Sequence, residues 1–333
     1  MKDELLLGSQ LWLHKHDSDE TLAAQIDAML DAGLTLTRIF IPWSDVETGR
    51  DERDWDLYDR LFRVCEPRGM LLTVTLSCLG APRWFERSLK GRVPTRADED
   101  ALGALRAGHV RETARRYAPS AALHSWILAN EPRITIPVTE ASLTRFREYL
   151  TNVHKHNPGL FSRLYKCGGP DEVGEILPDG KAKLDFGRWD FAAKVDWAGF
   201  ETARLNGLLA DISSALREID KKHPTTVNPD NITQASPYME GRDLWAFGGG
   251  TDFLGLSCHV SWHSTRFSSE KIHQSVGMFC DMTRSATGRG GANARAAGDL
   301  APSCRDEYFH VTELQAGTNY FSGLARCARP LPI

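Results

Sequence analysis

The stretch Leu123-His-Ser-Trp-Ile-Leu-Ala-Asn-Glu-Pro132 decides how the rest of the chain is interpreted. Its first half is an apolar run with the length and composition of a buried β-strand. The strand must end at Pro132, because proline has no N–H to donate to a neighbouring strand. Asn130 and Glu131 therefore stand at the carboxyl end of a buried strand, which is where (β/α)8 barrels present catalytic groups.

A strand-then-helix pattern recurs on both sides of this stretch. Further apolar strands are predicted over residues 5–12, 34–43, 70–77, 224–228, 252–259 and 308–313. Apolar residues at helical spacing predict helices over residues 19–32, 55–65, 101–117, 140–155, 196–221 and 269–284. Such alternation of apolar strands and helices predicts a parallel sheet covered on both faces. An open doubly wound sheet would begin in the same way, but no Gly-rich nucleotide-binding fingerprint follows the first strand. We therefore predict an α/β protein with the (β/α)8 (TIM) barrel fold.

We expect residues 1–333 to form a single barrel domain with one insertion. Residues 157–190 are rich in Gly, Pro and Asp and are too long for an ordinary loop between a helix and a strand. Only 20 residues follow Glu313, and residues 323–333 have the pattern of neither a strand nor a helix. The expected barrel is therefore truncated after its seventh strand, with the last β/α unit missing and two sheet edges left open.

The composition describes a globular chain without a nucleic-acid or membrane partner. A hydrophobic content of 41% with 25% charged residues permits a large core. The formal net charge of −4 comes without a basic patch, which argues against nucleic-acid binding. No stretch approaches the roughly 18 apolar residues of a membrane span, and the first residues lack the apolar region of a signal peptide. These features predict a cytoplasmic protein.

The cysteines and histidines predict neither a disulfide framework nor a metal site. The seven cysteines are odd in number and no two stand closer than 13 residues, so no CxxC pair exists. We interpret them as reduced thiols, mostly buried. His14, His16 and His263 do not combine with a carboxylate at the spacing of metal ligands. We expect no metal and no cofactor.

Glu313 repeats the setting of Glu131. An apolar strand again leads to the carboxylate, in Tyr308-Phe-His-Val-Thr-Glu313, and Gly317 then turns the chain. Glu131 ends the fourth predicted strand and Glu313 the seventh, and all strand ends of a barrel share one rim. Two carboxylates about 5–5.5 Å apart suit a retaining glycosidase, and a wider gap suits an inverting one. Arg38, near the end of the second strand, is a candidate cation to keep one carboxylate ionised.

Several segments carry a family resemblance. They are residues 32–38 with Trp43, 55–58, 81–84, 124–131, 252–255 and 313–317. Together these segments resemble the large clan of retaining (β/α)8-barrel glycosidases and, more narrowly, glycoside hydrolase family 42, the β-galactosidases. The resemblance implies that Glu131 is the acid/base, Glu313 the nucleophile, Asn130 the donor to the sugar 2-hydroxyl, and Arg38 the residue that orients the nucleophile.

The resemblance also suggests where a sugar would be contacted. His259 and Trp262 fall near the end of the sixth strand, where clan members place a ring that contacts the nucleophile or the sugar. Trp43, Trp84 and Trp262 stand at predicted strand ends, and indole rings suit the C–H faces of a pyranose. These residues are candidate substrate-binding positions. By the same resemblance the protein is expected to form a homo-oligomer, a trimer.

The function predicted from the sequence is a retaining exo-glycoside hydrolase that cleaves terminal β-D-galactosides with two Glu residues in a double displacement. Its partner would be a small-molecule carbohydrate. Two alternatives stay open: a clan glycosidase of another specificity (β-mannosidase, β-glucosidase or endo-glycanase), and a catalytically inactive carbohydrate-binding barrel. A metal-dependent lyase or isomerase barrel would need clustered Asp, Glu or His ligands at successive strand ends, and the sequence lacks them.

Overall fold

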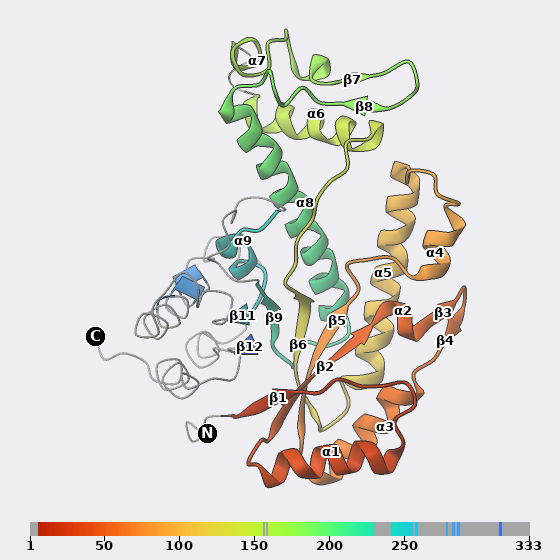
Figure 1. Cartoon of the computed structure of the whole chain (residues 1–333). Coiled ribbons are helices and arrows are strands. Elements are labelled where there is room, and N and C mark those ends of the chain that lie inside the picture. Colours follow the sequence, from red (N-terminus) through yellow and green to blue (C-terminus); the bar gives the residue numbers. More distant parts are fainter. Residues whose placement is uncertain are drawn as a thin grey trace.

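The structure is a computed structural model, and it describes residues 6–155, 157, 159–229, 241–255, 257–258, 278, 282–283, 285–286 and 313–314. Its centre is a sheet of six strands in the order β1-β2-β5-β6-β9-β10 (Figure 1), and every neighbouring pair is parallel. The strands are β1 (Gly8–Gln10), β2 (Leu36–Pro42), β5 (Leu71–Ser77), β6 (Leu123–Asn130), β9 (Thr225–Asn228) and β10 (Phe253–Leu254).

Helices connect these strands and cover the outside of the sheet. The longer ones are α1 (Asp19–Asp31), α3 (Asp56–Cys65), α5 (Arg96–Tyr117), α6 (Glu140–His154) and α8 (Phe191–Arg217). Shorter pieces are α2 (Trp43–Val46), α4 (Arg83–Ser88), α7 (Gly159–Leu164), α9 (Leu244–Gly248) and the 3-10 turns Glu66–Arg68 and Pro170–Glu172. Two small antiparallel hairpins complete the list, β3 (Glu47–Gly49) with β4 (Glu52–Arg53) and β7 (Glu175–Ile176) with β8 (Ala182–Lys183).

The sheet continues past β10 to the strand that carries Glu313. Gly255 N donates to Val227 O at 2.9 Å and Ser257 N to Pro229 O at 3.1 Å, so the chain keeps following β9 as it passes from β10 into β11 (Ser257–Cys258). β11 then pairs in parallel with β12 (Glu313–Leu314). The predicted strand order is therefore confirmed from the first to the seventh position of a (β/α) barrel. The helix predicted over 269–284 lies outside the described residues except at positions 278, 282 and 283, and the expected loss of an eighth unit lies outside them too.

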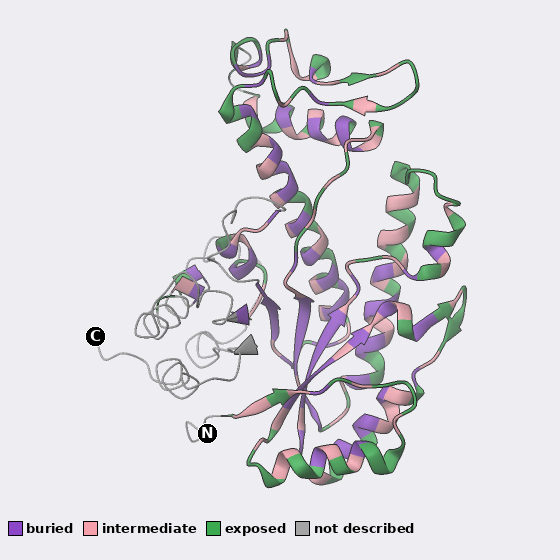
Figure 2. Ribbon diagram, viewed as in Figure 1, coloured by how far each residue is buried: buried purple, intermediate pink, exposed green. Residues whose placement is uncertain are grey.

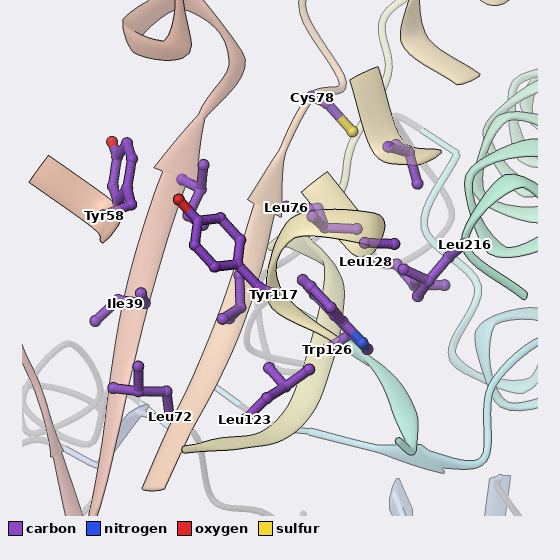
Figure 3. Packing of buried hydrophobic residues seen from close by; sticks show 14 of the residues in the cluster. Ile39, Tyr58, Leu72, Leu76, Cys78, Tyr117, Leu123, Trp126, Leu128 and Leu216 are labelled. Atoms are coloured by element: carbon purple, nitrogen blue, oxygen red, sulfur yellow. The ribbon is translucent and has the colours of Figure 1, made fainter. Parts of the chain in front are cut away.

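The outer face of the sheet is apolar and packs against the helices. Alternate strand residues point to opposite faces, and one set forms a continuous hydrophobic cluster with α1, α3, α5 and α8 (Figures 2 and 3). Strand members of this cluster include Ile39, Leu72, Leu76, Trp126 and Leu128. Its removal from water is the main force that holds helices to sheet.

The opposite, inner face is mostly polar. Its buried polar residues are Arg38, Thr73, Thr75, Ser125, Thr226 and Asn228, and the apolar Ile127 and Phe253 are buried beside Thr226. The sequence pattern predicted strands that are apolar on both faces, but the inner face is mostly polar. Buried polar groups must be hydrogen-bonded, and here they bond across strands: Thr73 Oγ1 and Ser125 Oγ lie 3.0 Å apart.

Helix α8 belongs to two hydrophobic clusters. Its 27 residues span roughly 40 Å. Its carboxyl half, with Leu205 and Leu216, packs on the sheet. In Figure 1 its first turns lie beside α6 and α7. They pack there against these helices and the segment predicted as an insertion, in a second cluster that includes Phe146 and Trp197. Helix α8 thus connects the segment predicted as an insertion to the sheet.

Two helices begin five residues earlier than predicted, and both for the same reason. Thr95 and Asp98 form a capping box, which starts α5 at Arg96 instead of residue 101. Asp190 accepts a hydrogen bond from Ala192 N and starts α8 at Phe191 instead of residue 196. A cap needs no apolar periodicity, so a search for apolar spacing begins too late. Within the described parts of the chain, no helix has the length and apolarity required to cross a bilayer.

Two of the three cysteines that the structure describes in full are deeply buried. Cys65 and Cys78 are free thiols without exposed surface, and Cys167 is half-buried. Burial raises the pKa of Cys65 and of Cys78 to about 12. Both therefore stay protonated near neutral pH and act as small apolar groups.

His109 of α5 is a buried histidine enclosed by tryptophan rings. Its ring stacks on Trp43 with centroids 5.4 Å apart and on Trp55 at 5.9 Å. The residue is 2% exposed, and its Nδ1 atom has no hydrogen-bond partner among the described residues. Burial, with a smaller effect of the Arg53 charge, lowers the pKa of His109 to about 3. The imidazole is neutral in the folded protein.

This histidine predicts an acid-sensitive fold. Because the pKa of His109 falls from about 6.5 in the unfolded chain to about 3 on folding, the unfolded state takes up a proton first as the pH drops. Its contribution to stability is full above about pH 6.5 and is lost at up to about 1.4 kcal/mol per pH unit towards pH 3. His109→Phe keeps a stacked ring that does not titrate. The free energy of unfolding of this variant, measured in urea, should therefore fall less steeply than that of the wild type as the pH is lowered from 6.5 towards 3.

The exposed His16 provides a matched control for this comparison. His16→Phe makes the same exchange outside the core, and its unfolding free energy is measured over the same pH range. Equal pH slopes for the wild type and His109→Phe would contradict the assignment.

Candidate active site

Arg38, the third residue of β2, reaches across the inner face to Asn130, the last residue of β6. Arg38 Nη2 donates to Asn130 Oδ1 at 2.6 Å, and Arg38 Nε donates to Thr75 Oγ1 at 3.0 Å. Arg38 is 6% exposed, so these bonds act in a low-dielectric setting where charge-assisted hydrogen bonds are strong. The sheet therefore brings Arg38 of β2 to the end of β6, where Asn130 and Glu131 follow one another.

The hydrogen bonds fix which way the Asn130 amide faces. Oδ1 accepts from Arg38 Nη2 and also from Asn228 Nδ2, at 2.9 Å. A guanidinium can only donate, so the amide cannot be turned round without placing donors against donors. The Asn130 NH2 group must point away from Arg38, with its protons available to a ligand hydroxyl.

Glu131 has an uncommon backbone conformation. Its φ angle is 44°, in the left-handed region that residues with a side chain seldom adopt. Such a conformation costs about 1–3 kcal/mol and persists where the surroundings hold it. Here Glu131 N donates to the carbonyl oxygen of Asn228 at 2.6 Å. The half-buried Glu131 thus leaves the strand in a direction set by β9.

A chain of hydrogen bonds runs from Asn130 towards the strand of Glu313. Asn228 Nδ2 also donates to Ser257 Oγ at 2.8 Å. Ser257 is the register partner of Glu313 in the parallel pair β11–β12. Strands four, five, six and seven are therefore adjacent in that order, and Glu131 and Glu313 stand at the fourth and seventh positions. The side chain of Glu313 lies outside the described residues.

A buried carboxylate holds two of the candidate tryptophans. Trp43 Nε1 donates to Glu47 Oε2 at 2.7 Å, and Trp84 Nε1 donates to Glu47 Oε1 at 2.9 Å. Glu47 is 2% exposed, and Arg53 Nη2 lies 3.4 Å from Oε2. Trp43 is 1% exposed and belongs to the hydrophobic core, whereas Trp84 is half-buried. Trp84 therefore has exposed surface that a ligand could contact. Trp43 has almost none, so it could affect a ligand only indirectly, through neighbours such as Glu47.

An aromatic pair that the sequence analysis did not single out lies on the inner face beside Arg38. The Trp12 ring stacks on Phe40 with centroids 5.2 Å apart and planes 7° apart. The guanidinium of Arg38 lies 4.6 Å from the Phe40 centroid. Trp12 is 64% exposed. The available signal was its position as the last residue of the first predicted strand.

The remaining candidates are outside the described residues. His259 and Trp262 cannot be placed relative to Arg38 and Asn130, and their predicted roles stay predictions. Across the residues that are described, no three His, Cys, Asp or Glu side chains gather as metal ligands would.

Comparison with known proteins adds a structural likeness. No protein-family model matches the chain, and no curated protein sequence matches it. The structure is similar to a catalytic mutant of a family 42 β-galactosidase from G. stearothermophilus, with a TM-score of 0.70, 18% identity and coverage of 85% of this chain and 44% of that one. A β-galactosidase from the Antarctic haloarchaeon Halorubrum lacusprofundi gives 0.69, 18%, 85% and 46%. The catalytic domain of a Paenibacillus polymyxa β-amylase gives 0.57, 12%, 88% and 84%.

These likenesses define the fold class as a (β/α) barrel. Within that class the structure resembles the family 42 β-galactosidases, as the sequence segments suggested. The chain spans less than half the length of the β-galactosidases that it resembles.

The Glu47 contacts lead to a prediction. A glutamine offers one acceptor oxygen, so in Glu47→Gln one indole N–H would face an amide NH2 group. A buried donor left unpaired costs about 1–3 kcal/mol. Glu47→Gln should therefore lower the unfolding free energy by about that amount and shift the tryptophan emission to longer wavelength in the folded protein.

The exposed Glu52, on the other strand of the same hairpin, is the control. Glu52→Gln should change neither quantity. An unfolding curve and emission spectrum of Glu47→Gln that match the wild type would contradict the role given to Glu47.

Proposed function

We propose that this protein is a retaining exo-glycoside hydrolase that cleaves terminal β-D-galactosides. The observation that carries the proposal is the geometry around Asn130. A buried Arg38 turns the Asn130 amide so that its NH2 group is available, directly before a carboxylate at the end of the fourth strand. A second glutamate, Glu313, stands on β12, which pairs in parallel with β11 where the chain continues from β10.

The proposed first step breaks the glycosidic bond. Glu131 gives its proton to the glycosidic oxygen, while a carboxylate oxygen of Glu313 forms a bond to the anomeric carbon. The leaving group departs as a neutral alcohol, and a covalent glycosyl-enzyme remains. The Asn130 NH2 group donates to the sugar 2-hydroxyl, a contact of the kind that strengthens as positive charge develops at the anomeric carbon.

The second step restores the enzyme. Glu131, now a carboxylate, takes a proton from water, and the water oxygen attacks the anomeric carbon as the bond to Glu313 breaks. Two inversions give net retention of configuration. Arg38 would help to keep the nucleophile ionised by its fixed positive charge.

A galactoside is the proposed substrate because of the structural likenesses. The solved structures named as β-galactosidases give TM-scores of 0.63–0.70 with this chain. The β-amylase domain and a family 10 endoxylanase give lower scores of 0.57 and 0.50. The endoxylanase leaves endo-acting cleavage of a glycan as a second candidate. The exposed ring of Trp12 suits stacking on a sugar in either case.

A panel of chromogenic glycosides tests the activity. We expect turnover of p-nitrophenyl β-D-galactoside to exceed that of the matching β-glucoside, β-mannoside and β-xyloside, with the released sugar first appearing as the β-anomer. Turnover of an internal glycan linkage alone would favour the endo-acting candidate. A folded chain that cleaves none of these substrates would refute the proposed hydrolase and favour a carbohydrate-binding barrel.

Azide distinguishes the two carboxylates. Glu313→Ala should lose at least about 10³-fold in kcat, and added azide should form the α-galactosyl azide, because a single displacement inverts the configuration. Glu131→Ala should accumulate the glycosyl-enzyme from an activated substrate, and azide should then give the β-galactosyl azide. The same anomer from both variants would rule out the assigned roles.

A further inference from the structure

We propose that Asn228, at the carboxyl end of β9, is a positioning residue that holds the Asn130–Glu131 pair in its reactive orientation. The inference rests on the proposed function and extends it to a residue on a strand that supplies neither carboxylate. Asn228 is fully buried. It would act through Asn130, without contacting the sugar.

Asn228 makes three hydrogen bonds to the residues that matter for the site. Its carbonyl oxygen accepts from Glu131 N at 2.6 Å. Its Nδ2 donates to Asn130 Oδ1 at 2.9 Å and to Ser257 Oγ at 2.8 Å. Asn228 of β9 is therefore hydrogen-bonded to Asn130 and Glu131 at the end of β6 on one side and to Ser257 of β11 on the other.

The orientation of the Asn228 amide follows from Arg38. Arg38 can only donate, so it requires Asn130 Oδ1 on its side. That oxygen in turn requires a donor from Asn228, because a turned amide would set two oxygens 2.9 Å apart. The order of donors and acceptors from Arg38 through Asn130 and Asn228 to Ser257 thus has one arrangement only.

The unused side of the same amide shows which part of Asn228 the site needs. Asn228 Oδ1 is buried and accepts no hydrogen bond from any described residue. A buried acceptor without a partner destabilises the folded chain. If Asn228 only stabilised the polar inner face, both ends of its amide should be hydrogen-bonded. We therefore infer that its role lies in the two bonds that Nδ2 donates.

Loss of these bonds should affect the 2-hydroxyl contact above all. Without Asn228 Nδ2, Asn130 Oδ1 keeps Arg38 but loses its second anchor, and the amide can turn about the bond that carries it. Its NH2 group would then no longer be fixed towards the sugar. The backbone bond from Glu131 N to Asn228 O remains in every variant, so the acid/base should stay in place.

The test compares a galactoside with its 2-deoxy analogue. Asn228→Asp keeps the size of the side chain but replaces the donor by an acceptor, and Asn228→Leu removes both. Thr226 is the matched control, since it lies on the same face of β9, is fully buried, and donates only to Val227 O. Values of kcat/KM would be measured for p-nitrophenyl β-D-galactoside and for its 2-deoxy form with the wild type, Asn130→Ala, both Asn228 variants and Thr226→Val.

We expect the preference for the 2-hydroxyl substrate to fall by at least about tenfold in Asn130→Ala and in both Asn228 variants. The 2-deoxy substrate should change by less than about threefold, and Thr226→Val should keep the wild-type preference. A purely structural role would lower both substrates equally and leave their ratio unchanged. That result would overturn the proposal.

A second measurement is independent of turnover. The side-chain amide signals of Asn130, assigned in ¹⁵N NMR spectra by their absence from Asn130→Asp, should move in both Asn228 variants and stay in place in Thr226→Val. If they stay in place in the Asn228 variants, the positioning role is wrong whether or not the protein is active. If they move and the wild type cleaves no glycoside, the proposed hydrolase fails while the positioning of Asn130 stands.

Discussion

The site depends on the fact that a buried guanidinium can only donate hydrogen bonds. Arg38 is nearly inaccessible to water, and its positive charge must be met by acceptors from the neighbouring strands. Thr75 supplies one and Asn130 another. Because Asn130 turns its oxygen to Arg38, its NH2 group is directed elsewhere. The same requirement passes on to Asn228, whose donor side must then face Asn130.

This chain of requirements is possible because the two faces of the sheet differ. The outer face is apolar and joins the helices into one core, so most of the apolar burial of the sheet lies on that side. The inner face can therefore hold Arg38, Thr75, Asn130 and Asn228, provided that each is hydrogen-bonded. Two inner-face atoms, Asn228 Oδ1 and Gln10 Oε1, have no partner among the described residues. Gln10 is the register partner of Arg38, and Asn228 donates a hydrogen bond to Asn130.

Much of the strand order was predictable from the sequence, because it follows from local patterns. Residues 123–130 form a strand of the predicted length, and the order of strands follows the order of the chain, as in a barrel whose right-handed crossovers all advance in the same direction. The start of α5 was missed because a capping box has no apolar period. Glu47 and Asn228 were missed for a different reason. Their partners lie on other loops and strands, and single-sequence patterns do not show which polar groups a sheet brings within hydrogen-bond distance.

Asn228 holds Glu131 and Asn130 in different ways, one through its backbone and the other through its side chain. Glu131 is held by a backbone carbonyl, which every amino acid at position 228 would offer. The left-handed conformation of Glu131 is thus fixed by the sheet itself, and the direction of its carboxylate depends on the fold. The Asn130 amide is held by a side chain, which a single substitution can remove. In the proposed hydrolase, a substitution at position 228 can therefore change the contact with a sugar hydroxyl while Glu131, the proposed acid/base, stays where the strands place it.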